Sequence, residues 1–169
     1  MGTKRIGILS DTHGWLNPKV FDFFKHCDEI WHAGDIGSTD IIDELNLIAP
    51  VKAVLGNCDD WDVRRITSEI MIFPCEEHKV MLKHIVGYPG KYDYSVPSII
   101  GEERPTILVA GHSHILKVMQ DQKNKLLFIN PGAAGKYGIH THITFIRFEI
   151  SGSHISNMEI FDEVRNNKI

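Results

Sequence analysis

The chain has 169 residues with 18 basic and 22 acidic side chains, three cysteines and ten histidines, and its net charge is −4. This length favours one domain over residues 1–169, and the acidic balance argues against a general or sequence-specific nucleic-acid binder, which would carry a basic footprint. Three cysteines cannot all pair, and no apolar run approaches the roughly 20 residues of a membrane span. We therefore expect a cytoplasmic protein without a membrane span.

Short apolar runs that end abruptly in polar residues recur along the chain, and such runs are typical of strands buried on both faces. Two segments between them have the apolar spacing of helices: one follows Pro18, and the other runs to Ile48 with Thr39 as its predicted N-cap. The first half therefore predicts a parallel β-α-β-α-β sheet. The runs are 6–9, 30–31, 51–55 and 106–110.

The second half has the alternating pattern of antiparallel strands, with hairpin turns at 121–124 and 151–153. Residues 88–97 contain the Pro, Gly and Tyr of a connecting loop, which we expect to contribute to a specificity pocket. The whole pattern predicts one α/β domain with two packed sheets and helices outside. The predicted strands of this half are 79–83, 117–120, 126–129, 143–150 and 155–161.

Oxygen and nitrogen donors follow five of these apolar segments, at the strand ends where open sheets bind ligands. Glycine precedes three of the donors and permits a sharp turn or a close backbone approach. Seven donors exceed the needs of one tetrahedral ion, but they suit two ions that share one carboxylate. Imidazole, carboxylate and amide ligands favour manganese, iron, nickel or zinc. The donors are Asp11, His13, Asp35, Asn57, His84, His112 and His114.

The order D-x-H, G-D, G-N-x-D, H and G-H-x-H over residues 6–132 resembles the calcineurin-like metallophosphoesterases. The short length, Cys58 and the triplet Asn130-Pro131-Gly132 resemble the small bacterial and archaeal phosphodiesterase subfamily, which also contains the retromer scaffold subunit. This resemblance implies a four-layer αββα sandwich of two mixed β-sheets flanked by helices.

The resemblance also implies two divalent ions, with manganese expected and nickel, iron, zinc or magnesium as alternatives. It implies a phosphoric ester hydrolase, a phosphodiesterase in type, that acts on a small phosphoester with a hydroxide between the ions as nucleophile. One ion would be bound by Asp11, His13, Asp35 and His114, and the other by the bridging Asp35 with Asn57, His84 and His112.

The chain departs from many members of the superfamily at Cys58, where they have a histidine that assists the leaving group. The general acid is therefore unassigned, and Asp59 is expected to orient the Asn57 loop. The expected catalytic residues are Asp35, Asn57, Cys58 and Asp59, and those expected to bind substrate are Asn57 and Arg64. A solvated helix face is an equal alternative for Arg64, and a covalent role for Cys58 is disfavoured because no base neighbours it.

The remaining histidines and tryptophans have plainer interpretations. We expect His32 to pack or to support a ligand, and His140 and His142 to be structural in preference to adventitious metal ligands. Core packing is favoured over the substrate entrance for Trp15 and Trp61, and surface or loop positions are expected for His26, His78 and His154.

The alternative functions are a protein-interaction scaffold of the same fold and a phosphomonoesterase. A nuclease is weaker because the composition offers no basic groove, and a homo-oligomer is left open.

Overall fold

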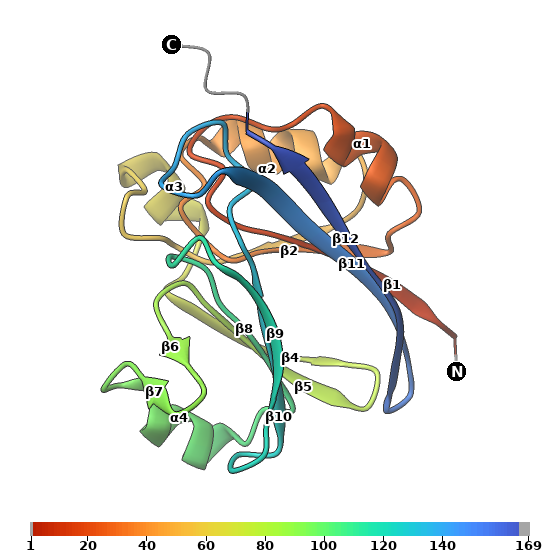
Figure 1. Cartoon of the computed structure of the whole chain (residues 1–169), viewed down its shortest axis with the longest axis vertical. Helices are drawn as coiled ribbons and strands as arrows, with labels where there is room; N and C mark the ends of the chain where they lie inside the picture. The colour runs from red at the N-terminus through yellow and green to blue at the C-terminus, as the bar shows by residue number, and fades with distance from the viewer. Residues whose placement is uncertain (1, 166–169) are drawn as a thin grey trace.

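The computed structural model describes residues 2–165, in which two five-stranded mixed sheets pack against each other (Figure 1). The first sheet has the order β12-β11-β1-β2-β3. Its β1, β2 and β3 are parallel, as the sequence predicts, and the long β11 and β12 add antiparallel at one edge. Its strands are β1 (Lys4–Leu9), β2 (Glu29–His32), β3 (Val51–Ala53), β11 (His142–Ser151) and β12 (His154–Val164).

The second sheet has the order β4-β5-β8-β10-β9, with a parallel centre of β5, β8 and β10 and an antiparallel strand at each edge. A small antiparallel hairpin of β6 (Gly87–Tyr88) and β7 (Lys91–Tyr92) lies outside it. The sheet strands are β4 (Ile70–Cys75), β5 (His78–Lys83), β8 (Ile107–Val109), β9 (Leu116–Asp121) and β10 (Leu126–Pro131).

Three separate apolar clusters account for the layers. One joins the facing sides of the two sheets, with Ile8 and Leu82 among its members. A second packs the other face of the first sheet against α1 and α2, as Phe24 shows, and a third packs the second sheet against α4 through Phe128. This arrangement confirms the expected sandwich of two mixed sheets flanked by helices (Figure 1). The helices are α1 (Lys19–Phe24), α2 (Thr39–Asn46), α3 (Trp61–Ile66) and α4 (Val96–Glu103).

The structure corrects three local predictions and adds one strand that was not predicted. The N-cap of α2 is Ser38, not Thr39, because the extended Ser38 places its Oγ where it accepts the Asp40 backbone N–H at 3.3 Å. Segment 88–97 is not one loop, since it contains part of the β6–β7 hairpin and begins α4. β3 ends at Ala53, short of the predicted 51–55. β4 was not among the predicted strands; it contains Pro74 and lies at the edge of its sheet, where proline is tolerated.

Of the helices formed within residues 2–165, none is both long and apolar enough to cross a membrane.

Candidate metal centre

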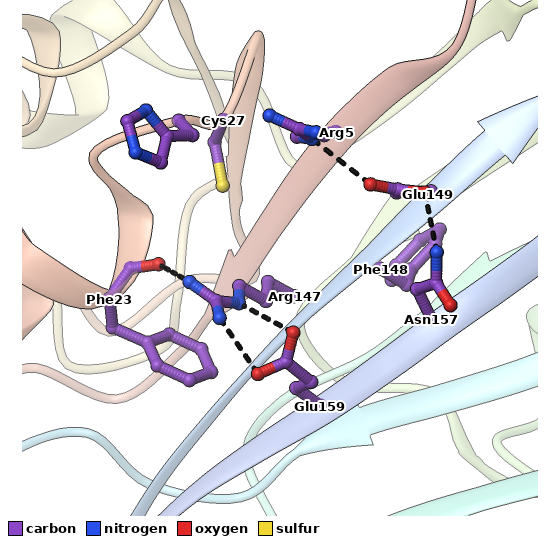
Figure 2. Close-up of a pocket in the computed structure, with 9 residues that line it drawn as sticks. Arg5, Phe23, Cys27, Arg147, Phe148, Glu149, Asn157 and Glu159 are labelled. Carbon is purple, nitrogen blue, oxygen red and sulfur yellow. Dashed lines mark hydrogen bonds and ion pairs between the residues drawn. The ribbon is translucent and has the colours of Figure 1, made fainter.

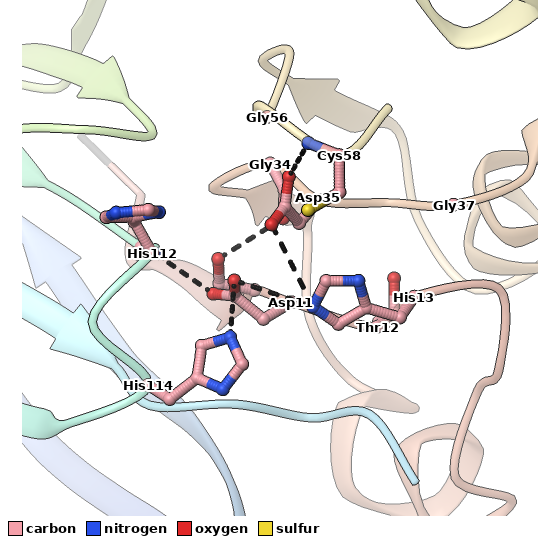
Figure 3. Close-up of polar contacts among 12 residues, drawn as sticks. Asp11, Thr12, His13, Gly34, Asp35, Gly37, Gly56, Cys58, His112 and His114 are labelled. Atoms are coloured by element: carbon pink, nitrogen blue, oxygen red, sulfur yellow. Dashed lines mark hydrogen bonds and ion pairs between the residues drawn. The ribbon is translucent and has the colours of Figure 1, made fainter. Parts of the chain in front are cut away.

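The predicted donors follow five strand ends from both sheets. Figure 3 shows Asp11, His13, Asp35, His112 and His114 around one space. His84 lies beside Asp35 and Asn57. The turn after β1 carries Asp11 and His13, and the one after β2 carries Asp35. Asn57 follows β3, His84 follows β5, and the segment between β8 and β9 carries both remaining histidines. We call these seven residues the strand-end cluster: Asp11, His13, Asp35, Asn57, His84, His112 and His114.

Asp11 lies at the bottom of this cluster and is fully buried. Its Oδ2 accepts the backbone N–H of His112 at 3.2 Å. Its Oδ1 is buried without a hydrogen-bond partner among the described residues, although Nε2 of His114 lies 3.0 Å away and Nε2 of His13 lies 4.0 Å away. A buried carboxylate oxygen that faces imidazole nitrogens without hydrogen-bond geometry is the arrangement expected of metal ligands.

His84 and Asp35 form the second part of the cluster. His84 Nδ1–H donates to the Ala33 carbonyl oxygen at 2.7 Å, which turns Nε2 toward Asp35 Oδ2 at 3.4 Å and Asn57 Oδ1 at 3.1 Å. A backbone carbonyl on Nδ1 is the usual way in which a ligating histidine is oriented. Three possible ligand atoms therefore converge at this point.

The pKa values of this pair show that the site favours positive charge. Burial lowers the pKa of His84, but the hydrogen bond with Asp35 and the charges of Asp11 and Asp35 together outweigh burial and raise it. Burial likewise raises the pKa of Asp35, but the hydrogen bonds from His84 and from the Cys58 backbone N–H at 2.8 Å outweigh it and hold that pKa well below its usual range. A proton on His84 or a metal ion can supply the favoured charge.

Five of the seven donors adopt left-handed backbone conformations, with φ between 47° and 66°. Residues other than glycine enter this region at a cost of about 1–3 kcal/mol each, and such residues gather at functional sites. The conformation turns each side chain sharply off the end of its strand and into the shared space. The five are Asp11, His13, Asp35, His112 and His114.

The glycines that precede the donors are required by close contacts, as expected. A Cβ on Gly56 would lie 2.0 Å from the backbone nitrogen and 2.1 Å from Oδ1 of Asp35. A Cβ on Gly111 would lie 2.2 Å from Ser10 Oγ and 2.9 Å from His84 Nδ1. The loops can approach each other this closely only where a side chain is missing.

His32 lies beneath the cluster and is fully buried, in agreement with a supporting role. The Gly34 N–H donates to its Nδ1 at 3.2 Å, so its Nε2–H donates to Thr12 Oγ1 at 2.9 Å, and the Thr12 hydroxyl donates to the Ile36 carbonyl oxygen. Burial lowers the pKa of His32 to about 3, and the ring stays neutral. The role of Thr12 in holding His32 was not predicted from the sequence.

Asn130 is a second residue whose role the sequence analysis missed, although its triplet was noted. Its Nδ2 donates to the Gly111 carbonyl oxygen at 2.9 Å and to Ser113 Oγ at 3.1 Å, and its Oδ1 accepts the Gly132 N–H at 3.0 Å. Asn130 thereby holds the segment that carries His112 and His114. In the sequence, the only local sign of this role was the pair of turn residues that follow, Pro131 and Gly132.

Asp59 connects two loops of the site. It is buried, and its two carboxylate oxygens accept the backbone N–H groups of Gly37 and Gly56, each at 2.8 Å. Cys58 is exposed beside Asp35, and burial and the Asp35 charge raise the pKa of its thiol. Arg64 is exposed on α3, and no contact among residues 2–165 joins its guanidinium to the strand-end cluster.

The prediction that Trp61 packs in the core is wrong. Its side chain is 72% exposed at the first position of α3, a helix in which only Val63 is buried. Trp15 is half-buried and packs against the apolar cluster that lies between the first sheet and helices α1 and α2.

The remaining histidines lie outside the cluster. His26 and His154 are exposed as expected, whereas His78 begins β5 and is half-buried. His142 begins β11 and pairs with Asp162, and the His140 ring centroid lies 6.4 Å from that of His114.

A cavity of about 250 Å³ elsewhere is lined by charged groups that are already paired (Figure 2). Arg147 donates to both carboxylate oxygens of Glu159, at 3.2 and 2.7 Å, and to the Phe23 carbonyl oxygen at 2.7 Å. Arg5 donates to Glu149 at 3.0 Å. No residue of the strand-end cluster lines this cavity.

The donor chemistry of the strand-end cluster fits divalent metal ions. Three overlapping groups of possible ligand atoms lie within 4.8 Å of one another: Asp11 with His13 and His114, Asp11 with Asp35 and His84, and His13 with Asp35 and Cys58. The first two groups share Asp11, and the last two share Asp35. Carboxylates shared between groups are what two neighbouring ions require.

Comparisons with known proteins agree with this geometry. Residues 5–153 match the model of the calcineurin-like phosphoesterase superfamily domain. A probable metallophosphoesterase of Methanothermobacter thermautotrophicus is 32% identical over 136 residues, which cover 76% of each chain. Vacuolar protein sorting 29 of Cryptosporidium parvum has a similar fold, with a TM-score of 0.73 at 20% identity over 96% of this chain and 98% of that one. Vps29 of Entamoeba histolytica complexed with zinc gives a TM-score of 0.72 at 20% identity, over 96% and 99% of the two chains.

Proposed function

The chain belongs to the calcineurin-like phosphoesterase superfamily, and on that basis we propose that it is a phosphodiesterase that depends on two divalent metal ions. The observation that carries the proposal is the convergence of donors on Asp11. Its ligand atom lies within 4.8 Å of those of His13 and His114 and, in a second group, of those of Asp35 and His84. Asp11 Oδ1 has no hydrogen-bond partner within residues 2–165. Burying that carboxylate without a cation nearby would be costly. The related metallophosphoesterase and the zinc complex of Vps29 support the same kind of site.

The proposal assigns one ion to Asp11, His13, Asp35 and His114, and the other to Asp35, Asn57, His84 and His112, with manganese as the expected metal. Bound ions of this kind supply a nucleophile from water at neutral pH and neutralise charge on a phosphoryl group. A histidine ligates a metal only in its neutral form, so protons compete with metal for His84. Metal binding should therefore weaken as the pH falls.

The remaining residues of the loops position this arrangement. The Cys58 N–H and the Asp59 carboxylate hold Asp35 and the Asn57 loop in place, and Asn57 Oδ1 points at the same space as His84 Nε2. We assign Asn57 to substrate binding as well. Arg64 stays a candidate for binding substrate phosphate because its exposed guanidinium has no partner among the described hydrogen bonds and ion pairs.

Cys58 limits the reactions that the site can promote. Its raised pKa keeps the thiol neutral at pH 7, so it offers neither a cationic proton donor nor a thiolate nucleophile. Loss of a general acid costs about 10²–10⁴ in rate for poor leaving groups and least for good ones. We expect nitrophenyl diesters to be hydrolysed faster than alkyl diesters by at least about 10²-fold, and equal rates would contradict this assignment.

The proposal is tested by metal analysis together with a hydrolysis screen. The purified protein is stripped of metal, loaded with Mn²⁺, Ni²⁺ or Zn²⁺, and assayed on nitrophenyl mono- and diesters. We expect about two ions per chain and turnover that disappears with chelator and in His84→Ala. Full turnover after chelation, or in that variant, would refute a metal-dependent mechanism.

A protein-interaction scaffold is the second candidate, because the vacuolar sorting proteins share the fold. The two functions differ in what metal does. Stoichiometric metal without turnover of any ester would favour the scaffold, whereas turnover of monoesters above diesters would favour a phosphomonoesterase.

A further inference from the structure

A cavity of about 410 Å³ lies between the β6–β7 hairpin and the start of β9, next to the strand-end cluster. Its size lies within the range of small-molecule sites. Its lining includes four apolar or aromatic side chains and one lysine: Val86, Tyr88, Ile115, Phe128 and Lys117.

The cavity is continuous with the strand-end cluster through one short segment. Gly111, His112 and Ser113 line it. The His112 backbone N–H is bonded to Asp11, and its ring meets the His84 ring with 5.3 Å between centroids. A phosphoryl group held by the cluster would therefore have the cavity beside it.

The cavity walls are mainly apolar and partly exposed. Ile115 is 48% exposed and Tyr88 is 44% exposed, whereas Phe128 is buried against the core below them. Apolar side chains that are exposed in a concave surface next to a polar cluster are typical of a ligand site. The ligand group that would cover them must itself be apolar.

Two contacts hold Tyr88 in place. Lys117 Nζ lies 4.7 Å from the centroid of the Tyr88 ring, a cation–π distance. The hairpin that carries Tyr88 is fixed by the Tyr92 hydroxyl, which donates to Asp121 Oδ2 at 2.6 Å. Asp121 is buried and also accepts from Asn124, so this anchor is well ordered. These contacts set the flat Tyr88 ring as one wall of the cavity.

We infer that this cavity binds the organic group of the phosphoester substrate and that it selects a flat, apolar aryl group. The inference rests on the proposed phosphodiesterase function for the chemistry next to it. The walls of the pocket are an aromatic ring and aliphatic side chains, which suit the face of an aryl group better than the hydroxyl groups of a sugar. The Lys117 ammonium already lies over the Tyr88 ring.

The experiment measures binding separately from turnover. Isothermal titration of the Mn²⁺-loaded protein compares phenylphosphonate with methylphosphonate, which share the phosphonate and differ only in the organic group. We expect phenylphosphonate to bind at least about tenfold more tightly, because only its ring covers apolar surface in the cavity. The same pair is then titrated against Tyr88→Ala and Ile115→Ala, whose folding is checked by circular dichroism and thermal melting.

Matched controls lie close by on the surface and outside the cavity. Tyr94→Ala removes a tyrosine that is 94% exposed, and Val118→Ala removes an aliphatic side chain that is 37% exposed on β9. We expect the phenyl preference to fall about threefold or more in Tyr88→Ala and Ile115→Ala and to stay unchanged in both controls. Methylphosphonate has no ring to cover and should bind all five proteins about equally.

A turnover series separates this inference from the proposed function. Phenyl and methyl p-nitrophenyl phosphates share a leaving group, so a preference in kcat/KM for the phenyl ester reports the cavity. Equal affinity for the two phosphonates, or a preference that survives both cavity variants, would overturn the inference. A phenyl preference in binding without metal-dependent turnover would uphold the cavity and refute the hydrolase.

Discussion

Two groups of charged side chains in this protein are built in opposite ways. In the strand-end cluster, Asp11, Asp35 and His84 are buried at close range. Asp11 Oδ1 has no hydrogen-bond partner within residues 2–165 (Figure 3). Around Arg147 and Arg5, every guanidinium is matched with a carboxylate at the surface (Figure 2).

The difference shows which group serves a ligand. A paired surface cluster is complete by itself and contributes about 0–1 kcal/mol per pair to stability. A buried cluster with incomplete pairing and strained backbone lowers stability unless something binds to it. Substitutions in and around the two groups test this difference.

The largest effect is expected for Asp35, which both proposed ions share. Asp35→Ala should lower metal-dependent turnover of a nitrophenyl diester by roughly 10³-fold or more and reduce the metal content. Glu159→Gln, which breaks an ion pair of the other group, should keep turnover within about twofold of the parent. Similar losses in both variants, measured by kcat/KM and metal analysis, would remove the contrast.

The next effect concerns backbone packing at the site. Gly56→Ala should cost about 3 kcal/mol of unfolding free energy, because its Cβ would overlap the Asp35 backbone and carboxylate, neither of which can move away freely. Gly101 in α4 has open space around it, and Gly101→Ala should stabilise the protein by about 0.5–1 kcal/mol. Urea unfolding measures both, and equal effects would contradict the close approach.

A smaller effect is expected for Asp59→Asn, which keeps the shape of the side chain that connects the Gly37 and Gly56 loops. In Asp59→Asn one carboxylate oxygen becomes an NH₂ group that faces a backbone N–H, so either the Gly37 or the Gly56 hydrogen bond is lost. We expect metal affinity to fall about 10–100-fold, as for other residues that orient ligands. Titration with Mn²⁺ is the measurement, and an unchanged affinity would show that the loops hold their positions without Asp59.

The smallest effect depends on pH and concerns His32, a buried residue of this region whose hydrogen bonds are complete. Its folded pKa of about 3 lies below the ordinary value of about 6.5, so the unfolded chain gains a proton first as the pH falls. Its stabilising contribution is present above pH 6.5 and is lost as the pH drops from 6.5 toward 3. At pH 5.5 the loss should be about 1 kcal/mol.

Urea unfolding of the metal-free protein at pH 7.5 and 5.5 measures that loss. His32→Gln keeps a donor and an acceptor but cannot titrate, so it should lack this part of the pH dependence. The contribution of the other histidines cancels in the difference between the unfolding free energies of parent and variant. Parallel pH profiles would mean that His32 does not stay neutral in the folded protein.

Much of the fold could be predicted because its signals are local. Continuous apolar runs marked the central strands, and Thr144 to Glu149 alternate as expected of β11. The failures also have local causes, since the edge strand β4 contains a proline and the Pro, Gly and Tyr of 88–97 indicated a loop where a hairpin forms. Trp61 was misjudged because apolarity does not say whether a neighbouring layer exists to cover a side chain.

The sequence by itself determined which donor atoms are present and in what order they follow the strands, because residue type and strand periodicity are properties of short segments. The tertiary structure alone decided that Asp11 and His114, 103 positions apart in the sequence, face each other at 3.0 Å. It also decided that Asn130 braces the histidine segment and that the hairpin of Tyr88 borders a cavity. These contacts depend on how two sheets stack and on left-handed turns at strand ends, and neither leaves a pattern in any one stretch of chain.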